Sequence, residues 1–289
     1  MSWRTVVIAN RAKLELRLNY LICRGKEEKR IHLSEISTLI VESTAVSLTA
    51  SLLSELIDRK IKVIFCDVKH NPQAELIPYY GCHDTSSKLQ EQIAWEQNVK
   101  TSIATAIIYE KIRKQAQHLE YRQFPENKML YNYLEGVQYG DASNREGHAA
   151  KVYFNTLFGM PFSRQEDMNI NSGLNYGYAI LLSSFNREIV NNGYATQLGI
   201  YHRGCDNQFN LACDLMEPYR ILIDSIVFEN MDKSFDSELK RLLLDVLNQK
   251  IWINGQEHFV NNGIRIYCRS IFDALNQKNS KKIKFYEKF

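Results

Sequence analysis

The spacing of apolar residues changes along the chain from a strand-like pattern to a helical one. Residues 1–80 hold short apolar runs and one clear alternation, Lys13–Leu18, which is typical of a half-buried strand. One helix is expected from an N-cap at Ser47 to about Arg59, because leucines recur there at helical spacing. The other predicted strands are Thr5–Ile8, Asn19–Cys23, Ile31–Ile36, Thr38–Val41, Ile61–Cys66 and Glu75–Tyr80.

A boundary is expected near Pro78–Asp84, where proline and glycine interrupt the pattern. Beyond it, apolar spacing predicts one long helix from Ser86 to about His118. Further helices are expected over residues 124–139, 141–159, 170–193, 221–230 and 234–277, the last with an extended piece at 250–260. We therefore predict an α+β protein with a small N-terminal β domain (1–78), a linker (79–85) and a larger all-α C-terminal domain (86–289).

Composition sets limits on this prediction. The chain has 289 residues and is 45% hydrophobic, which suits a globular protein with a full core. Its net charge of +3 is too small to indicate a nucleic-acid partner by itself. The six cysteines form no C-x-x-C pair, and neither a secretory run nor a membrane span is found, so we expect a cytoplasmic protein with reduced thiols. The lysine-rich residues 278–289 are interpreted as a solvated, frayed end.

Candidate chemistry gathers in residues 196–220. His202 is followed by Asp214 and Glu217, whose i, i+3 spacing places both carboxylates on one face of a helix. Two carboxylates and an imidazole that face one space suit a divalent cation. By itself the pattern is weak, because most such pairs lie on solvated helix faces. Pro218 disfavours helical angles at Glu217, so a kink or a new helix is expected there.

Two more stretches place polar side chains beside small residues, where a ligand or another helix can approach closely. Glu146 precedes Gly147, and Ser143 three residues earlier makes a capping-box pattern, which is the simpler local explanation of Glu146. Asn175 and Tyr176 precede a glycine as well. The simpler explanation of Tyr176 is a buried tyrosine whose hydroxyl bonds the backbone.

Together these stretches resemble the CRISPR-associated integrase, the catalytic subunit of the complex that acquires spacers. The resemblance runs the full length of the chain, and the length and last motif resemble the subtype that accompanies a single large RNA-guided nuclease. Four motifs carry it in order, namely Ser143–Ala150 with Tyr153, Leu174–Tyr178, Gly199–His202 and Phe209–Arg220.

The resemblance implies a metal-dependent DNA integrase and endonuclease, which inserts captured DNA into a CRISPR array by attack of a 3′-hydroxyl on a phosphodiester. By motif, the metal ligands for Mg²⁺ or Mn²⁺ would be Glu146, His202 and Glu217, with Asp214 as a further acidic residue of the catalytic site. Many family members have Asp in place of Glu217. Tyr176 matches a family tyrosine close to the scissile phosphate. The candidate DNA-binding residues are therefore Arg145, Asn175 and Tyr176.

The resemblance also implies partners: double-stranded DNA with 3′ ends, a second copy of this chain, and a small CRISPR-associated protein in a four-to-two complex. We expect the N-terminal β domain to form the homodimer, because it carries no candidate chemistry. Two alternatives stay open. One is a structure-specific, metal-dependent nuclease that uses water. The other is a non-catalytic DNA-binding scaffold, in which Glu146 caps a helix and Glu217 is a surface acid.

Overall fold

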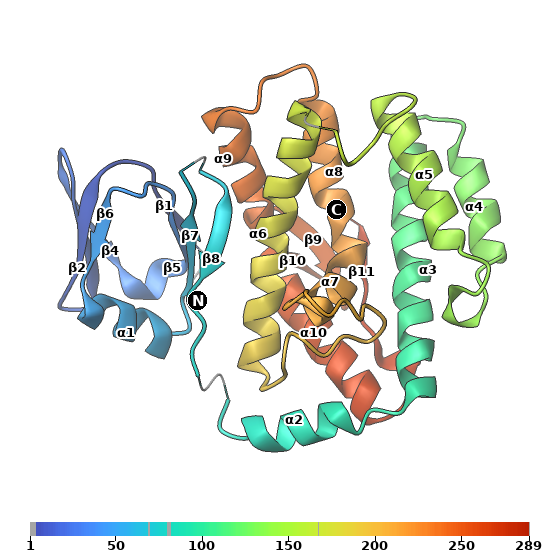
Figure 1. Ribbon diagram of the computed structural model, residues 1–289, viewed down its shortest axis with the longest axis horizontal. Coiled ribbons are helices and arrows are strands. Elements are labelled where there is room, and N and C mark those ends of the chain that lie inside the picture. The colour runs from blue at the N-terminus through green and yellow to red at the C-terminus, as the bar shows by residue number, and fades with distance from the viewer. Residues whose placement is uncertain (1–3, 69, 80–81, 167, 289) are drawn as a thin grey trace. The chain divides into compact units, whose positions relative to one another are not determined.

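Figure 1 shows the computed structural model of the chain, which describes residues 4–68, 70–79, 82–166 and 168–288. Contacts within the chain divide it into two compact units, Met1–Gly81 and Cys82–Phe289. The first unit is built from strands and one helix, and the second is mainly helical, which confirms the predicted α+β class. Within these described ranges, no helix combines the length and the apolar character needed to cross a bilayer.

Two sheets form the N-terminal unit. The first has the order β1-β5-β7-β8, in which β8 alone is antiparallel to its neighbour, and the second has the order β4-β3-β2-β6. The strands are β1 (Arg4–Ile8), β2 (Ala12–Arg17), β3 (Tyr20–Arg24), β4 (Glu28–His32), β5 (Ile36–Val41), β6 (Val46–Leu48), β7 (Lys62–Cys66) and β8 (Pro72–Glu75).

Side-chain alternation places the core of this unit. In β2, Leu14 is fully buried while Lys13 on the opposite face is exposed, as the alternation predicts. Every residue of the central strand β5 is buried, as expected of a parallel strand covered on both faces. The helix α1 (Ala50–Asp58) begins after Thr49, whose hydroxyl accepts from Leu52 N at 3.4 Å, so its N-cap lies two residues beyond the predicted Ser47.

Two strand predictions are wrong. The strand predicted at Ile31–Ile36 is interrupted, because β4 ends at His32 and Leu33–Glu35 form a 3₁₀ turn before β5 begins at Ile36. The strand predicted at Glu75–Tyr80 lies earlier, because β8 pairs with β7 only as far as Glu75. Pro78 has no backbone N–H to extend the ladder. Tyr80 lies outside the described residues.

The larger unit packs its helices around α6 (Asn169–Asn191), which contacts α7, α8, α9 and α10 (Figure 1). The long helix α3 carries α4 and α5 on one side. The remaining helices are α2 (Thr85–Ile93), α3 (Gln97–Tyr121), α4 (Asn127–Glu135), α5 (Arg145–Phe158), α7 (Asn210–Met216), α8 (Arg220–Glu229), α9 (Ser237–Asp245) and α10 (Val260–Asn276). Short 3₁₀ turns lie at Leu33–Glu35, Tyr139–Asp141, Glu217–Tyr219, Val246–Asn248 and Ser280–Lys282.

The single helix predicted over residues 86–118 is two helices, α2 and α3, because the chain turns between them at residues 94–96. Trp95 in this turn is only 8% exposed, and its indole N–H donates to Asn276 Oδ1 at 2.8 Å. Gln92, near the end of α2, is buried and donates to two backbone carbonyls after α6. Tertiary contacts therefore stabilise this turn, which the spacing of apolar residues does not predict.

The C-terminal unit is not all-α, and this prediction is corrected. Three antiparallel strands form a sheet of order β10-β9-β11. The extended piece at 250–260 is a hairpin, because Asn254 and Gly255 take φ of 55° and 74°, as in the two-residue turns that join such strands. The tail is not frayed either, since Tyr286 is fully buried. The strands are β9 (Lys250–Ile253), β10 (Gln256–Phe259) and β11 (Tyr286–Lys288).

The close contact of α6 with α8 depends on Gly177. A Cβ added there would lie 2.4 Å from Cγ2 of the fully buried Ile223. We expect Gly177→Ala to lower the free energy of unfolding by about 1–3 kcal/mol, as overpacked cores do. Urea denaturation followed by circular dichroism measures this change.

Gly147→Ala on α5 is the matched control, because its Cβ would meet only the exposed side chain of Asn144. Alanine is the better helix former, so this variant should be neutral or slightly more stable. Equal stabilities of the two variants would show that α6 and α8 are not packed closely at Gly177.

Candidate metal and phosphate site

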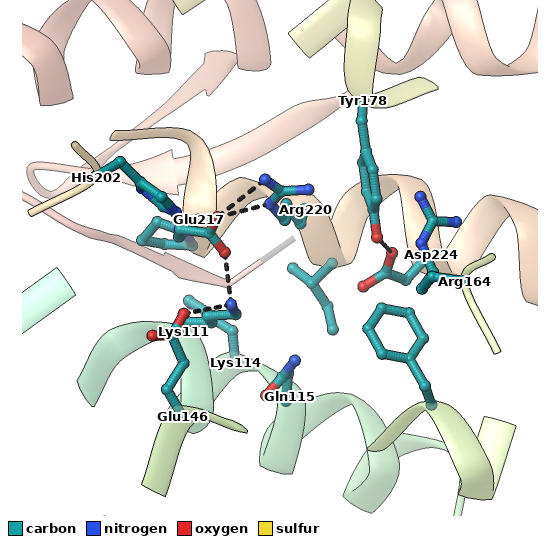
Figure 2. A pocket seen from close by; sticks show the side chains of 13 residues that line it. Lys111, Lys114, Gln115, Glu146, Arg164, Tyr178, His202, Glu217, Arg220 and Asp224 are labelled. Carbon is teal, nitrogen blue, oxygen red and sulfur yellow. Dashed lines mark hydrogen bonds and ion pairs between the residues drawn. The ribbon is translucent and has the colours of Figure 1, made fainter. Parts of the chain in front are cut away.

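A cavity of about 220 Å³ lies among α3, α5, α6, α8 and the turn between α7 and α8 (Figure 2). In Figure 2, Glu146, Glu217 and His202 lie at one side of this pocket, and Tyr178 and Asp224 lie at the other. The described residues that line it are Lys111, Lys114, Gln115, Glu146, Phe154, Arg164, Tyr178, His202, Glu217, Pro218, Arg220, Ile221 and Asp224. The lining is thus largely charged, with both signs present.

Glu146 comes from the first turn of α5, and it does not cap its own helix. The carboxylate of Asp141 accepts the backbone N–H groups of Arg145 and Glu146 at 2.8 and 3.0 Å. Ser143 Oγ instead donates to the carbonyl of Gly136. The capping-box explanation of Glu146 is therefore wrong, and the Glu146 side chain, 23% exposed, faces the pocket.

Glu217 opens the 3₁₀ turn Glu217–Tyr219, so a new helical segment begins there as expected, but Glu217 keeps helical angles (φ −51°, ψ −46°) despite the proline that follows it. Its side chain is 4% exposed. Oε1 accepts from Arg220 Nε at 3.0 Å and Nη2 at 2.9 Å, and Oε2 lies 2.6 Å from Lys111 Nζ. Burial raises the pKa of Glu217, but Lys111 and Arg220 outweigh this effect and bring it to about 2. Glu217 is therefore ionised at neutral pH.

Lys111, on α3, joins the two glutamates. Its ammonium lies 2.6 Å from Glu146 Oε1 and 2.6 Å from Glu217 Oε2 (Figure 2). Burial lowers the pKa of Lys111, but the two carboxylates raise it above its ordinary value. The motifs did not contain Lys111. The signal that could have found it is its position between Ile108 and Ile112, which places a lysine on the buried face of a predicted helix.

Asp214 holds His202 and the loop that carries it. The Asp214 carboxylate is fully buried and accepts the backbone N–H groups of Ile200, Tyr201 and His202. It also lies 2.5 Å from His202 Nδ1, and this hydrogen bond raises the pKa of the imidazole. Because Nδ1 is hydrogen-bonded to Asp214, Nε2 is the ring nitrogen that remains available to bind a ligand in the pocket. Both oxygens of Asp214 already take part in hydrogen bonds with this loop. Asp214 therefore positions His202 and is not itself free to contact a ligand in the pocket.

The three predicted metal ligands line one pocket, but they do not form a ready coordination sphere. Across the described parts of the chain, no three His, Cys, Asp or Glu side chains form a cluster that could hold a metal ion. Between Glu146 and Glu217 the ammonium of Lys111 takes the central position. Glu146, His202 and Glu217 thus line the same pocket, but the two glutamates are already paired with Lys111.

The opposite side of the pocket contains groups that the motif analysis missed. The hydroxyl of Tyr178 donates to buried Asp224, whose pKa burial raises to about 6. The guanidinium groups of Arg164 and Arg220 lie 5.3 and 4.7 Å from the centre of the Tyr178 ring. Lys114 is almost fully buried, and burial lowers its pKa to about 8. Two arginines and a lysine facing one space suit an anion such as a phosphate.

The three candidate DNA-binding residues lie outside the pocket lining. Asn175 is exposed, and its Oδ1 accepts from Arg164 Nη2 at 2.6 Å, so it is linked to the lining by one bond. Tyr176 is 2% exposed and packs against Phe235. Arg145 lies over the ring of Tyr133 at 5.6 Å. The pocket lining therefore does not include any of the three candidate DNA-binding residues.

The donor set fits a divalent metal ion. Two carboxylates and a neutral imidazole nitrogen are ligands that Mg²⁺ and Mn²⁺ accept. The pair of 2.6 Å contacts from Lys111 to Glu146 and Glu217 shows that one cation can bridge both carboxylates. With the arginines opposite, the chemical types of these side chains would suit a metal ion and a phosphate ester, once Lys111 no longer held the two carboxylates.

Comparison with known proteins gives the family. Residues 5–254 match the family described as CRISPR associated protein Cas1. The CRISPR-associated endonuclease Cas1 of Neisseria meningitidis serogroup C (strain 8013) is 31% identical over 294 residues, covering 99% of this chain and 97% of that protein. A CRISPR-associated endonuclease Cas1 of Francisella tularensis subsp. novicida (strain U112) is 25% identical, covering 89% and 88%. The chain belongs to the Cas1 family, which confirms the family that the four motifs resemble.

Solved structures have the same fold. A casposase bound to its integration product gives a TM-score of 0.77 at 20% identity, covering 96% of this chain and 92% of that one. A Cas1 protein from Thermotoga maritima gives 0.75 at 15% identity, covering 94% and 97%. A Cas6-RT-Cas1–Cas2 complex gives 0.75 at 18% identity, covering 97% of this chain and 36% of that chain.

The role of Asp214 is testable by stability. We expect Asp214→Asn to lower the free energy of unfolding by about 2–4 kcal/mol, because one amide oxygen cannot replace two carboxylate oxygens and buried donors are left unpaired. Asp206→Asn, on the same loop but exposed, is the control and should change stability by less than about 0.5 kcal/mol. Urea denaturation measures both variants, and equal stabilities would contradict this role of Asp214.

Proposed function

We propose that this chain is a metal-dependent DNA integrase and endonuclease that inserts captured foreign DNA into a CRISPR array. Membership of the Cas1 family supports the class of enzyme, since relatives across nearly the whole chain are named CRISPR-associated endonucleases. The structural observation that carries the proposal is the pocket that Glu146, Glu217 and His202 share with the cations Lys111, Lys114, Arg164 and Arg220.

Glu146, Glu217 and the Nε2 atom of His202 are the proposed ligands of one Mg²⁺ or Mn²⁺. When bound, such an ion polarises a phosphate and stabilises the negative charge that develops in the transition state. Asp214 is not a ligand in this proposal. It acts on the site by fixing the orientation of His202, through the 2.5 Å contact with Nδ1.

Arg164, Arg220 and Lys114 are the proposed phosphate-binding side chains. The two arginines present planar donors that match phosphate oxygens, and both lie against Tyr178 in the pocket. A phosphodiester bound there would lie next to the two glutamates, because Arg220 also contacts Glu217. Arg145, Asn175 and Tyr176 stay predictions as DNA contacts, although none of the three lines the pocket and Tyr176 is only 2% exposed.

The proposed nucleophile is a 3′-hydroxyl delivered by donor DNA. The glutamates are weak general bases, because both are paired with cations and the pKa of Glu217 is about 2. A site of this kind works better with a nucleophile that the substrate itself brings. Positioning a bound hydroxyl in line with a phosphate can lower the barrier by roughly 7–11 kcal/mol.

Of the two alternatives, hydrolysis by water at the same site is the second candidate, because it would use the same ligands. The non-catalytic scaffold required Glu146 to cap a helix and Glu217 to lie at the surface. Asp141 caps α5 instead, and Glu217 is buried in ion pairs. Those two features favour an enzyme over a scaffold.

Glu217→Ala should reduce joined product by more than about a hundredfold, the effect expected when a group that stabilises the transition state is lost. Binding of duplex DNA should largely survive, because it depends on phosphate contacts spread over a wide surface. A strand-transfer assay with labelled target DNA and a gel-shift assay measure the two effects. Glu135→Ala, an exposed carboxylate on α4, should retain both activities.

The same assay separates integration from hydrolysis when the donor ends in a 3′-deoxynucleotide. We expect no joined product from that donor and normal product from the 3′-hydroxyl donor. Identical target cleavage with both donors would show that water is the nucleophile, and the hydrolytic alternative would replace the integrase.

We also propose that the chain works as a homodimer with a small second protein. Solved structures of similar fold include complexes described as Cas1–Cas2, which motivates that partner. The N-terminal unit is the proposed dimer interface. Its edge strand β1 presents Val7 at 38% exposure, and Tyr20 on β3 is 41% exposed.

Deleting residues 1–78 should give a monomer or insoluble protein, measured by light scattering after size-exclusion chromatography. In the full chain, Val7→Lys should weaken the dimer, because a charge on an edge strand opposes strand-to-strand association. Lys26→Ala, in an exposed turn of the same unit, is the control and should stay dimeric. A soluble deletion that still dimerises would place the interface in the helical unit.

A further inference from the structure

Lys111 contacts the same carboxylate oxygens that a bridging metal ion would use. Its ammonium lies 2.6 Å from one oxygen of Glu146 and 2.6 Å from one oxygen of Glu217, and its side chain is 15% exposed. A divalent cation and this ammonium cannot both hold those oxygens in the same positions. Metal binding at the proposed site therefore requires Lys111 to move.

The charges of this side of the pocket are balanced by the protein itself. Glu146 and Glu217 contribute two negative charges, and Lys111 and Arg220 contribute two positive ones. Asp214 carries a further negative charge, but its oxygens already accept hydrogen bonds from three backbone N–H groups and lie against His202 Nδ1. Adding a divalent cation to a balanced, largely buried group of charges is unfavourable unless an anion enters with it.

The rest of the pocket offers a place for both the anion and the ammonium. Lys114, Gln115 and Arg164 line the same cavity as Lys111, and they provide donors for a phosphate. The lysine has a flexible four-carbon stem, so its ammonium can turn from the glutamates toward a phosphate in that cavity without movement of α3.

From this geometry we infer that Lys111 couples metal binding to DNA binding, by exchanging the two glutamates for a DNA phosphate as its partner. The inference rests on the proposed metal site. Its consequence is reciprocal: the metal ion binds weakly to the free protein and more tightly when DNA is bound, and DNA gains affinity by the same factor. The factor expected for such a coupling is about 5–150.

The test is calorimetric titration of the full chain with Mn²⁺, with and without a saturating DNA duplex that has a free 3′-hydroxyl end. The wild-type protein should bind Mn²⁺ at least about fivefold more tightly with DNA. Lys111→Met should bind Mn²⁺ at least about fivefold more tightly than wild type without DNA, because no ammonium competes. DNA should then add little further affinity for the metal ion.

Two variants control for charge and packing. Lys111→Arg keeps a cation between the glutamates and should retain the coupling. Lys128→Met removes an exposed charge from α4, outside the lining of the pocket, so the coupling should persist. Lys111→Gln replaces Lys111→Met if the latter does not fold, as judged by circular dichroism, and the same tightening is expected.

The outcomes distinguish the inference from the proposed function. If Glu217→Gln abolishes Mn²⁺ binding while Lys111→Met and Lys111→Gln leave the DNA-free affinity unchanged or weaker, the metal site stands and the coupling role of Lys111 is overturned. If Glu217→Gln leaves Mn²⁺ binding unchanged, the proposed metal site itself is wrong, and the inference falls with it.

Discussion

Glu217, which is buried, and Glu146, which is partly exposed, repel each other in one pocket, and the positive charges of Lys111 and Arg220 allow the fold to hold them together. Taking each carboxylate out of water costs several kcal/mol, so the site depends on close and complete pairing. Lys111 lies 2.6 Å from both carboxylates, and Arg220 binds the other oxygen of Glu217 through two nitrogens. The network joins α3, α5 and the turn before α8. Removing either cation would leave the buried Glu217 with only one of its two charged partners.

The C-terminal strand β11 stabilises this network of ion pairs. Tyr286 is fully buried, and its hydroxyl donates to the carbonyl of Pro218 at 2.9 Å, next to Glu217. Lys114 lies 3.8 Å from the centre of the Tyr286 ring and donates to the carbonyl of Glu287 at 2.8 Å. The last residues of the chain therefore hold the turn that carries a proposed metal ligand.

The acidic side of the pocket was predicted by resemblance to the family's motifs, since local spacing alone favoured simpler explanations of these residues. Glu146, His202 and Glu217 all line the cavity. Lys111 and Arg164 were missed, since each reaches the site from an element whose sequence shows no motif. For Arg164 only tertiary packing determines that the side chain points inward, whereas the position of Lys111 between Ile108 and Ile112 is a signal that the sequence contains.

Other features of the structure could not be predicted from the sequence, and each has its own physical reason. Tyr176 and Tyr178 lie two positions apart on α6, and so many residues of that helix are buried that the pattern does not tell which tyrosine faces the pocket. The turn at Trp95 interrupts an apolar spacing that continues in both α2 and α3. The pair Asn254-Gly255 carried a hairpin signal inside residues 250–260, which were predicted only as one extended piece.

The central claim is that Glu146, Glu217 and His202 bind one metal ion beside a DNA phosphate. Anomalous diffraction from Mn²⁺ in crystals of the complex with branched DNA tests it most directly. The account predicts one peak in the pocket, roughly 2.0–2.3 Å from an oxygen of each glutamate and from His202 Nε2. A peak bound by other residues, or DNA phosphates placed in the pocket with Lys111 still between the glutamates and no peak, would contradict it.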